Sequence, residues 1–163
     1  MREIKATEIN ENLIKMIGTE AMIIAAGDEK KYNMMTASWG FMGQMWGKPS
    51  AAVVVRPQRY TMEFLEKHDT FSLSFLGDNP EIYKILGTTS GRDTDKSAAT
   101  DMYAEFGFGA PVFEKSRLTV ICKKLYVQRM EKECFIDKSP LKWYPDEDYH
   151  YVIIGEIEKV LEK

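Results

Sequence analysis

The sequence predicts a mostly β fold with short helices, in which antiparallel strands form a barrel. Several apolar or alternating stretches bounded by turn residues have the pattern of strands. The helical stretches between them are short and irregularly placed, so the regular β–α alternation that builds a parallel sheet is absent. The chain has 163 residues, an ordinary length for one domain, and no repeat or linker divides it. We therefore expect a single domain over residues 1–163.

The first half of the chain is predicted to hold a helix and then three strands. Apolar residues at helical spacing predict the helix over Ile9–Ile17. Ala21–Gly27 has the pattern of a buried strand, ended by a charged turn. The next strand begins at Asn33 and is expected to run into a corner rich in Gly and Trp at Gly40–Gly47. Ser50–Val55, with its β-branched end, is the third strand.

Two short helices flank a strand in the middle of the chain. The stretch YTMEFLEKHD is predicted to be a helix that Thr61 caps at its N-terminus, with His68 either a surface residue or a cap at its C-terminus. Thr70–Leu76 alternates apolar residues with serines, the pattern of a half-buried strand. Pro80 begins the next helix and Gly87 is its expected end.

Two long strands are predicted near the C-terminus, at Leu118–Gln128 and Tyr149–Glu158. The Lys123-Lys124 pair interrupts the apolar pattern of the first and indicates a bulge or an exposed edge.

Composition excludes several classes of protein. Apolar residues make up 44% of the chain and charged residues 29%, which is the balance of a globular protein. The 22 basic and 25 acidic side chains give a net charge of −3 without any basic run, so we expect no nucleic-acid partner. No apolar run approaches the roughly 20 residues of a membrane span. The N-terminus also lacks the apolar segment of a signal peptide, so we expect a cytoplasmic protein without a membrane contact.

The cysteines and histidines do not form a metal-binding pattern. Cys122 and Cys134 are too far apart for a CxxC pair, and we expect both to be free thiols in a reducing compartment. His68 and His150 do not lie at ligand spacing from a cysteine or from each other. No dedicated metal site is therefore expected.

Residues 88–96, TTSGRDTDK, contain the most suggestive local chemistry. Hydroxyls, a glycine, an arginine and a lysine follow directly after a predicted helix end. Hydroxyls, free backbone N–H groups and a nearby cation are what a phosphate group requires. The alternative is a solvated surface loop in which Asp93 or Thr94 caps the next helix.

A second candidate anion site is RPQRYT, residues 56–61. Two arginines flank the end of a strand, and the helix N-terminus that follows offers unpaired N–H groups. The alternative is a simple helix cap with two solvated arginines. Two separate cationic, hydroxyl-rich turns in a net acidic chain favour the anion site.

The stretch NMMTASWGFMGQMW, residues 33–46, could line a site for a flat ligand. Its small residues leave backbone groups accessible, and Trp39 and Trp46 could form walls. Methionines and tryptophans at such spacing are ordinarily core residues, and we expect core here. His150 opens a strand beside several carboxylates; a structural role is expected, although the ordinary pKa of histidine would also suit an acid.

Taken in order, several segments resemble the flavin reductase-like family of FMN-binding split barrels, which includes flavoredoxins and NAD(P)H:flavin oxidoreductases. The segments are MTASWG, KP, VVVRPQRYT, FSLSF, LGTTSGRDTDK, CKKLY and DYHYVIIGEI. The resemblance runs from about Met22 to Val160, and RPxRYT followed at this distance by SGRDxDK is its most specific part. It implies an antiparallel split β-barrel with short helices, usually a homodimer with FMN near the subunit interface.

The resemblance also implies roles for individual residues. Those that would line the flavin ring and ribityl chain are Met35, Thr36, Ala37, Ser38 and Trp39. Those that would meet the phosphate are Arg56, Arg59, Tyr60 and Thr61 from one turn and Ser90, Arg92 and Lys96 from the other. His150 would lie on the nicotinamide side, although a tyrosine precedes it where relatives commonly have Gly-Asp.

The function implied is that of an FMN-dependent oxidoreductase in which NADH or NADPH donates hydride to flavin N5. No Rossmann glycine motif is present, so the nicotinamide would bind directly over the flavin. One alternative is a flavoredoxin-type electron carrier that exchanges electrons with a redox protein partner. Another is a flavin-binding module without catalysis. Steady oxidation of NAD(P)H would distinguish the enzyme from both.

Overall fold

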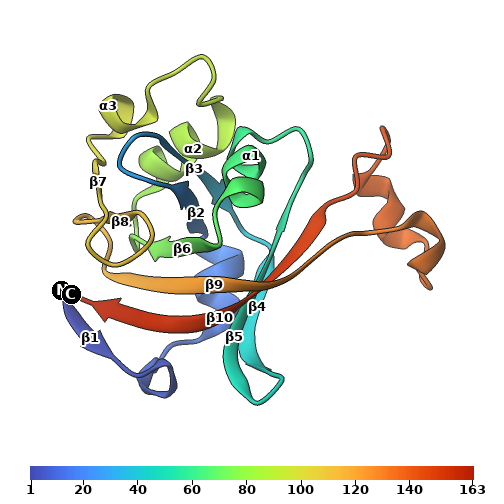
Figure 1. Ribbon diagram of the computed structural model, residues 1–163. Helices are drawn as coiled ribbons and strands as arrows, with labels where there is room; N and C mark the ends of the chain where they lie inside the picture. The colour runs from blue at the N-terminus through green and yellow to red at the C-terminus, as the bar shows by residue number, and fades with distance from the viewer.

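An eight-stranded antiparallel sheet forms the body of the computed structural model, which describes all residues from 1 to 163 (Figure 1). The strands follow the order β3-β2-β6-β9-β10-β5-β4, and β1 pairs with β10. Their bounds are β1 (Arg2–Ile4), β2 (Met22–Gly27), β3 (Tyr32–Ala37), β4 (Gly40–Met45), β5 (Lys48–Val55), β6 (Thr70–Phe75), β9 (Leu118–Arg129) and β10 (Tyr151–Glu162). A separate two-stranded sheet is formed by β7 (Ala104–Glu105) and β8 (Val112–Phe113).

The order of the strands explains why the sheet curls. Its two edge strands, β3 and β4, are consecutive in the chain and are joined only by Ser38 and Trp39. The edges therefore meet at this corner, while no hydrogen-bonded pairing closes the sheet between them. The result is an open, barrel-like sheet, and the mostly β, antiparallel prediction is confirmed.

Three short α-helices cover the β2–β3 side of the sheet (Figure 1). They are α1 (Tyr60–Lys67), α2 (Pro80–Thr88) and α3 (Lys96–Thr100). The remaining helical turns are Ala6–Glu8, Lys15–Thr19, Lys132–Cys134 and Ser139–Trp143. None of the helices has the length and apolar content that a membrane span requires.

Strand β2 is apolar without interruption because both of its faces are buried in the core. Ile24 and its neighbours two residues away pack inside the curled sheet, in a cluster of 20 buried residues with Phe71 and Phe75. Ile23 and Ala25 face the other way and pack beneath α2 in a second cluster. Because β2 is buried on both faces, its pattern does not alternate.

The predicted half-buried character of β6 is wrong, because its serines are also buried. Ser72 donates a hydrogen bond to the carbonyl of Pro111, and Ser74 lies 3.3 Å from the hydroxyl of Thr119. Each hydroxyl is thus satisfied inside the protein, which removes the cost that a buried polar group would otherwise carry.

Two further predictions in the first half are corrected. The N-terminal helical turn is Lys15–Thr19, and Oδ1 of Asn12 accepts a 3.1 Å bond from the N–H of Lys15, so this helix begins later than the prediction over Ile9–Ile17. The expected corner at Gly40–Gly47 is largely the strand β4, which pairs with β5. A Cβ on Gly40 would lie 2.6 Å from the carbonyl oxygen of Ala52, so the glycine here serves close strand packing.

Other predicted boundaries hold more closely. Asn79 and Pro80 begin α2, although the helix continues one residue beyond Gly87. The bulge is confirmed close to the lysine pair, because the register of β9 and β10 shifts between Ile154 and Gly155.

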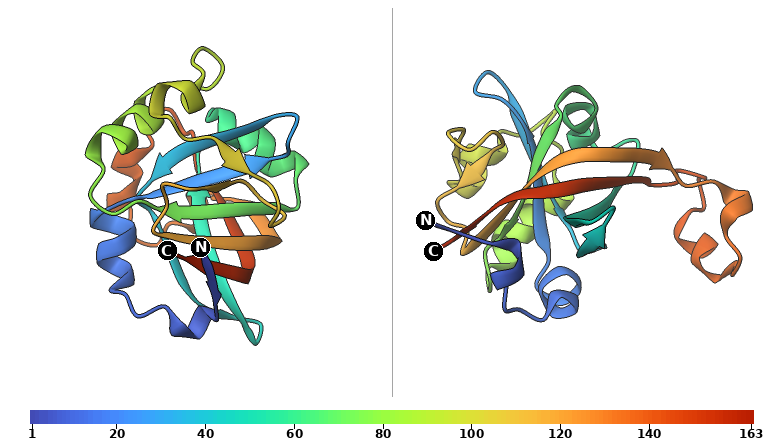
Figure 2. Two further views of the ribbon diagram at one scale, coloured as in Figure 1. Left: turned by 90° about the vertical axis from the view of Figure 1, so that its left-hand side faces the viewer. Right: turned by 60° about the horizontal axis from the view of Figure 1, so that its bottom comes forward.

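Beyond the ends of β9 and β10, residues 130–149 form a segment that we call the arm. It projects away from the sheet and carries two short helical turns (Figures 1 and 2). Arg56 ties its base to the end of β5 through an ion pair with Asp148 and a 2.7 Å bond to the carbonyl of Trp143. The base of the arm therefore lies at the same end of the sheet as the β3–β4 corner, where Trp143 meets Trp39.

Candidate functional site

Two adjoining cavities lie where the β3–β4 corner, α1, α2 and the arm meet. The first, the aromatic pocket, measures about 270 Å³. It is lined by Met35, Thr36, Ala37, Ser38, Trp39, Val54, Arg56, Arg59, Trp143 and His150. The second, the hydroxyl pocket, measures about 160 Å³. It is lined by Asn33, Met35, Gln58, Arg59, Tyr60, Thr61, Leu86, Thr88, Thr89, Ser90, Gly91, Arg92 and Lys96. Met35 and Arg59 line both, so the two cavities adjoin each other.

Every residue to which the family resemblance gave a role at the ring, the phosphate or the nicotinamide lines one of these two pockets, whereas Trp46, the other possible wall, lines neither. One placement differs from the expectation. Arg56 lies in the aromatic pocket, where it pairs with Asp148, and the structure does not bring it to the hydroxyl pocket.

Helix α1 presents its N-terminus to the hydroxyl pocket. Arg59 is the capping residue, and no side chain caps the helix. The expected cap by Thr61 is therefore wrong. Thr61 lies two residues after Arg59, and its hydroxyl accepts a 2.8 Å bond from the side-chain amide of Asn33. The first N–H groups of α1 consequently remain available to an anion.

The loop between α2 and α3 closes the hydroxyl pocket from the other side. A Cβ on Gly91 would lie 2.0 Å from Oδ1 of Asn33, so only glycine allows this close approach. Arg92 forms a 2.5 Å ion pair with Glu63 on α1 and places its guanidinium 4.7 Å from the centre of the Tyr60 ring. The two turns predicted separately therefore form one pocket.

Lys96 is the buried cation of the hydroxyl pocket. Asp95, rather than the expected Asp93 or Thr94, caps α3 by accepting from two backbone N–H groups. This cap holds Lys96 at the first position of the helix, with 7% of its surface exposed. Its Nζ donates 2.9 Å bonds to the carbonyls of Met34 and Leu86. Burial, with a smaller effect of Arg59, lowers the pKa of Lys96 to about 8.

The aromatic pocket has flat walls. The rings of Trp39 and Trp143 meet edge to face, with centres 5.6 Å apart, and the imidazole of His150 lies 5.2 Å from Trp39. The expectation that the tryptophans of residues 33–46 are core is wrong: Trp39 is 40% exposed and Trp46 is 58% exposed. Trp143 comes from the arm, whose sequence carries no motif that would have indicated it.

His150 is buried, and its Nδ1 lies 2.8 Å from the hydroxyl of Tyr144. Burial, and to a lesser degree Arg56, lowers the pKa of His150 to about 4, while Asp148 acts in the opposite direction. The ring is therefore neutral near pH 7, and the acid role that an ordinary histidine pKa would allow is not available.

Neither cysteine belongs to the site. Cys122 is buried in the core and Cys134 is exposed on the arm, and both are free thiols, as expected. The structure contains no cluster of three or more His, Cys, Asp or Glu side chains that could hold a metal ion.

A family model described as "Flavin reductase like domain" matches residues 14–163. No curated protein sequence matches the chain.

Solved structures match with the same fold. Flavoredoxin from Methanosarcina acetivorans is 22% identical, with a TM-score of 0.71 over 100% of this chain and 76% of its own. An FMN-binding protein from Thermus thermophilus with bound p-hydroxybenzaldehyde is 23% identical, with a TM-score of 0.68 over 100% and 82%. An NADH:FAD oxidoreductase from Streptomyces globisporus, in complex with NAD and FAD fragments, is 15% identical, with a TM-score of 0.65 over 88% and 74%. The expected fold, an antiparallel split barrel, is thereby confirmed.

Proposed function

Because the chain belongs to the flavin reductase-like family, we propose that it binds FMN and catalyses the reduction of flavin by NADH or NADPH. The observation that carries the proposal is that the two pockets lie side by side and share two lining residues. A cationic, hydroxyl-rich cavity adjoins an aromatic one through Met35 and Arg59, which is the arrangement that a phosphate attached to a flat ring requires.

The donor set of the hydroxyl pocket fits a phosphate group. Arg59, Arg92 and Lys96 supply positive charge, and no carboxylate is among the residues that line the cavity. Hydroxyls of Thr88, Thr89, Ser90 and Thr61 lie on the same walls, beside the uncapped N-terminus of α1. Such groups bind an oxyanion through charge-assisted hydrogen bonds.

The aromatic pocket fits the ring of the flavin. Trp39, Trp143 and Met35 would exclude water from it, and the backbone of Ala37 and Ser38 would hold its edge. When bound, the flavin supplies the hydride-accepting chemistry at N5, so the protein needs no nucleophile of its own. The task of the protein is to hold a nicotinamide against the ring, about 3–3.5 Å away and aligned.

A second candidate is an FMN electron carrier of flavoredoxin type. Trp39 and Trp143, which form the outer wall of the aromatic pocket, are 40% and 52% exposed. A redox protein could therefore reach the edge of the pocket from solution. A flavin-binding module without turnover is the third candidate.

The exposed apolar side chains of the β4–β5 hairpin and of β9 favour a homodimer. Phe41, Met45 and Trp46 lie on or just after β4, and Trp46 packs against Tyr126 of β9 with ring centres 6.4 Å apart. Contiguous apolar surface of this kind marks an interaction site. We infer that a second copy of the chain covers it, beside the aromatic pocket.

An absorbance spectrum of the purified protein, before and after NADH is added without oxygen, tests the function. We expect a flavin spectrum, with or without added FMN, that bleaches when NADH or NADPH is added. Bleaching by a reduced protein partner, but not by NADH or NADPH, would select the electron carrier. A protein that shows no spectral change with added FMN would contradict all three candidates.

A further inference from the structure

Tyr144 reaches the functional site from the arm, and no motif in the sequence indicated it. Its hydroxyl lies 2.8 Å from Nδ1 of His150, and the two rings are nearly perpendicular, at 81°. Both side chains are buried, with 6% and 8% of their surfaces exposed. The guanidinium of Arg56 lies 5.1 Å from the centre of the Tyr144 ring, on the side of the arm's base. The tyrosine is therefore held in place independently of its bond to the histidine.

The surroundings of the pair indicate which atom carries the shared hydrogen. The only other partner of the Tyr144 hydroxyl is Sδ of Met130, at 3.6 Å. A thioether sulfur is a weak acceptor, whereas a neutral imidazole has one full acceptor nitrogen. This difference in acceptor strength favours a hydroxyl that donates to Nδ1 of His150 rather than to Met130, with the hydrogen of the neutral ring on Nε2.

Nε2 of His150 has no partner within the protein. Ser116 Oγ is the one fully buried side-chain polar atom without a hydrogen bond, so Nε2 is not sealed inside the core. His150 lines the aromatic pocket, and its Nδ1 edge is occupied by Tyr144. The free edge of the ring is thus available to a ligand in that pocket.

The charged groups around His150 keep it neutral. Arg56, from the end of β5, and Arg59, from the start of α1, both disfavour a positive charge on the ring. Asp148, from the arm, favours one, but it is paired with Arg56. Burial is the largest effect and acts in the same direction as the arginines.

We propose that Tyr144 is a positioning residue that fixes His150 as the neutral Nε2–H tautomer, so that the aromatic pocket presents one hydrogen-bond donor to a ligand carbonyl. A carbonyl occurs both on the flavin ring and on the carboxamide of a nicotinamide, and either can accept from Nε2–H. The identity of the ligand rests on the proposed function, whereas the tautomer is a property of the protein alone. His150 then orients a ring and does not act as an acid.

The tautomer can be observed without any ligand. The chain has only two histidines, so a long-range ¹H–¹⁵N spectrum of labelled full-length protein contains two imidazoles, and His68→Gln assigns them. At pH 7 we expect His150 to show the Nε2–H pattern in the wild type. In Tyr144→Phe we expect a mixture of tautomers and a higher histidine pKa. An Nδ1–H pattern in the wild type, or an unchanged spectrum in Tyr144→Phe, would overturn the proposal.

Tyr149→Phe is the matched control, because Tyr149 is also buried and its ring lies 5.0 Å from that of Tyr144. Binding of FMN, and of NAD⁺ to the FMN-loaded protein, is measured by fluorescence for both variants. We expect Tyr144→Phe to weaken one of the two ligands about two- to tenfold, the value of one hydrogen bond, and Tyr149→Phe to weaken neither. Weaker binding of FMN would assign the carbonyl to the flavin ring, and weaker binding of NAD⁺ would assign it to the carboxamide of the nicotinamide.

Unchanged affinity for both ligands in Tyr144→Phe would overturn the donor role. Failure of the wild type to bind FMN at all would instead contradict the proposed function, and the spectrum would still decide the tautomer.

Discussion

Lys96 and His150 are the two buried bases of the site, and they differ in their hydrogen-bond partners. The ammonium of Lys96 donates to two backbone carbonyls, which are neutral acceptors that leave its charge uncompensated. The ring of His150 is instead hydrogen-bonded to a neutral hydroxyl, that of Tyr144. Burial lowers the pKa of both, so near pH 7 the pocket combines a charged donor at one end with a neutral ring at the other. These two protonation states suit a phosphate and a carbonyl, respectively.

Lys96→Ala is expected to weaken FMN binding on the order of tenfold or more, because a charge-assisted contact is worth roughly 1.5–3 kcal/mol. Riboflavin, which lacks the phosphate, should bind nearly as before. The affinity of the wild type for FMN should also fall as the pH rises through about 8, where Lys96 loses its proton. Fluorescence titration with both flavins measures these effects.

Lys84→Ala removes an exposed lysine from α2 and serves as the control for that experiment. Equal losses for FMN and riboflavin would show that Lys96 supports the fold or the ring site. An unchanged affinity for FMN would support the alternative that residues 88–96 form a solvated surface loop without a role in binding.

The burial of His150 makes stability depend on pH. Its pKa falls from an ordinary 6.5 to about 4, so between these values the unfolded chain takes up a proton that the folded ring does not. The free energy of unfolding should therefore decrease as the pH falls from 7 to 5, by about 1–2 kcal/mol from this residue. Urea unfolding at both pH values should show a smaller decrease in His150→Gln than in His68→Gln. Equal decreases in the two variants would contradict the burial of a neutral ring.

At the scale of the elements, the paired strands β9 and β10 connect the core to the arm. Their register shifts next to Gly155, and this bulge lets two long strands bend while they remain paired. The space opposite Gly155 is already filled, since a Cβ there would lie 2.9 Å from both Cys122 and Phe71. The bend of β10 and the packing of the core therefore depend on the same position.

Gly155→Ala is expected to destabilise the protein by about 1–3 kcal/mol, because the added methyl group overpacks the core. Gly43→Ala is the matched control, since Gly43 also lies in a strand and no atom would come within 4 Å of its added Cβ. Urea unfolding of both variants gives the comparison. A cost for Gly155→Ala no larger than that for Gly43→Ala would contradict the packing described for this bulge.

At the scale of the whole molecule, sequence patterns predicted those parts of the site whose residues lie close together in the chain. The cationic turns at residues 56–61 and 88–96 were found because each holds its cations and hydroxyls within a few residues. The residues that the arm brings to the site could not be predicted in this way. Arg56 and Asp148 are 92 residues apart, and Arg56 binds both the carboxylate of Asp148 and the carbonyl of Trp143, which lines the pocket. Their contact depends on the bend of two long strands, which no spacing in the sequence encodes.

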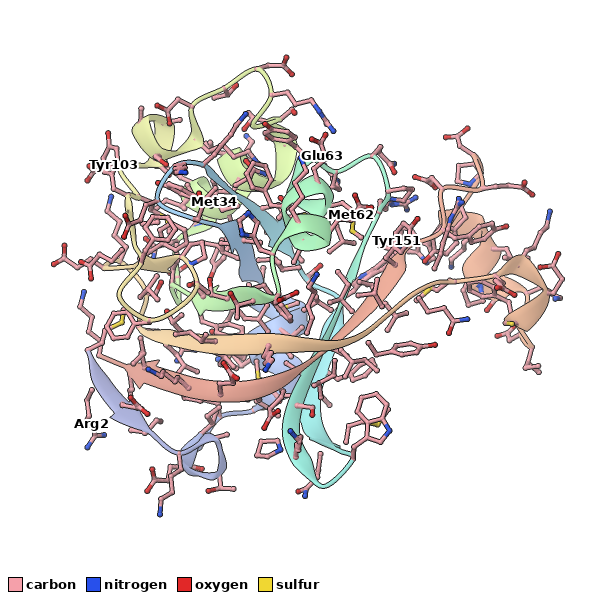
Figure 3. All side chains as sticks on the ribbon, viewed as in Figure 1. Arg2, Met34, Met62, Glu63, Tyr103 and Tyr151 are labelled. Atoms are coloured by element: carbon pink, nitrogen blue, oxygen red, sulfur yellow. The ribbon has the colours of Figure 1, made fainter.

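Sequence patterns are limited in a similar way for the apolar side chains within the segment 33–46. A spacing of tryptophans and methionines predicts burial, and it does not distinguish the interior of one chain from an interface between two. Met34 packs beneath α2 inside the protein (Figure 3), whereas Phe41 and Trp46 face outward from the edge of the sheet. The inferred homodimer accounts for both with one principle, since each side chain is buried against apolar neighbours.

Trp46→Glu tests that inference. We expect the wild type to sediment as a dimer and the variant to shift toward the monomer, because a carboxylate at the centre of an apolar interface loses its hydration without gaining a partner. Tyr103→Glu is the matched control: Tyr103 is 62% exposed, close to the 58% of Trp46, and lies on the other side of the molecule from the β4–β5 hairpin (Figure 3). Sedimentation velocity over a range of protein concentrations measures both variants. A monomeric wild type would contradict the homodimer. A dimer that withstands Trp46→Glu as well as it withstands Tyr103→Glu would show that the interface does not include Trp46.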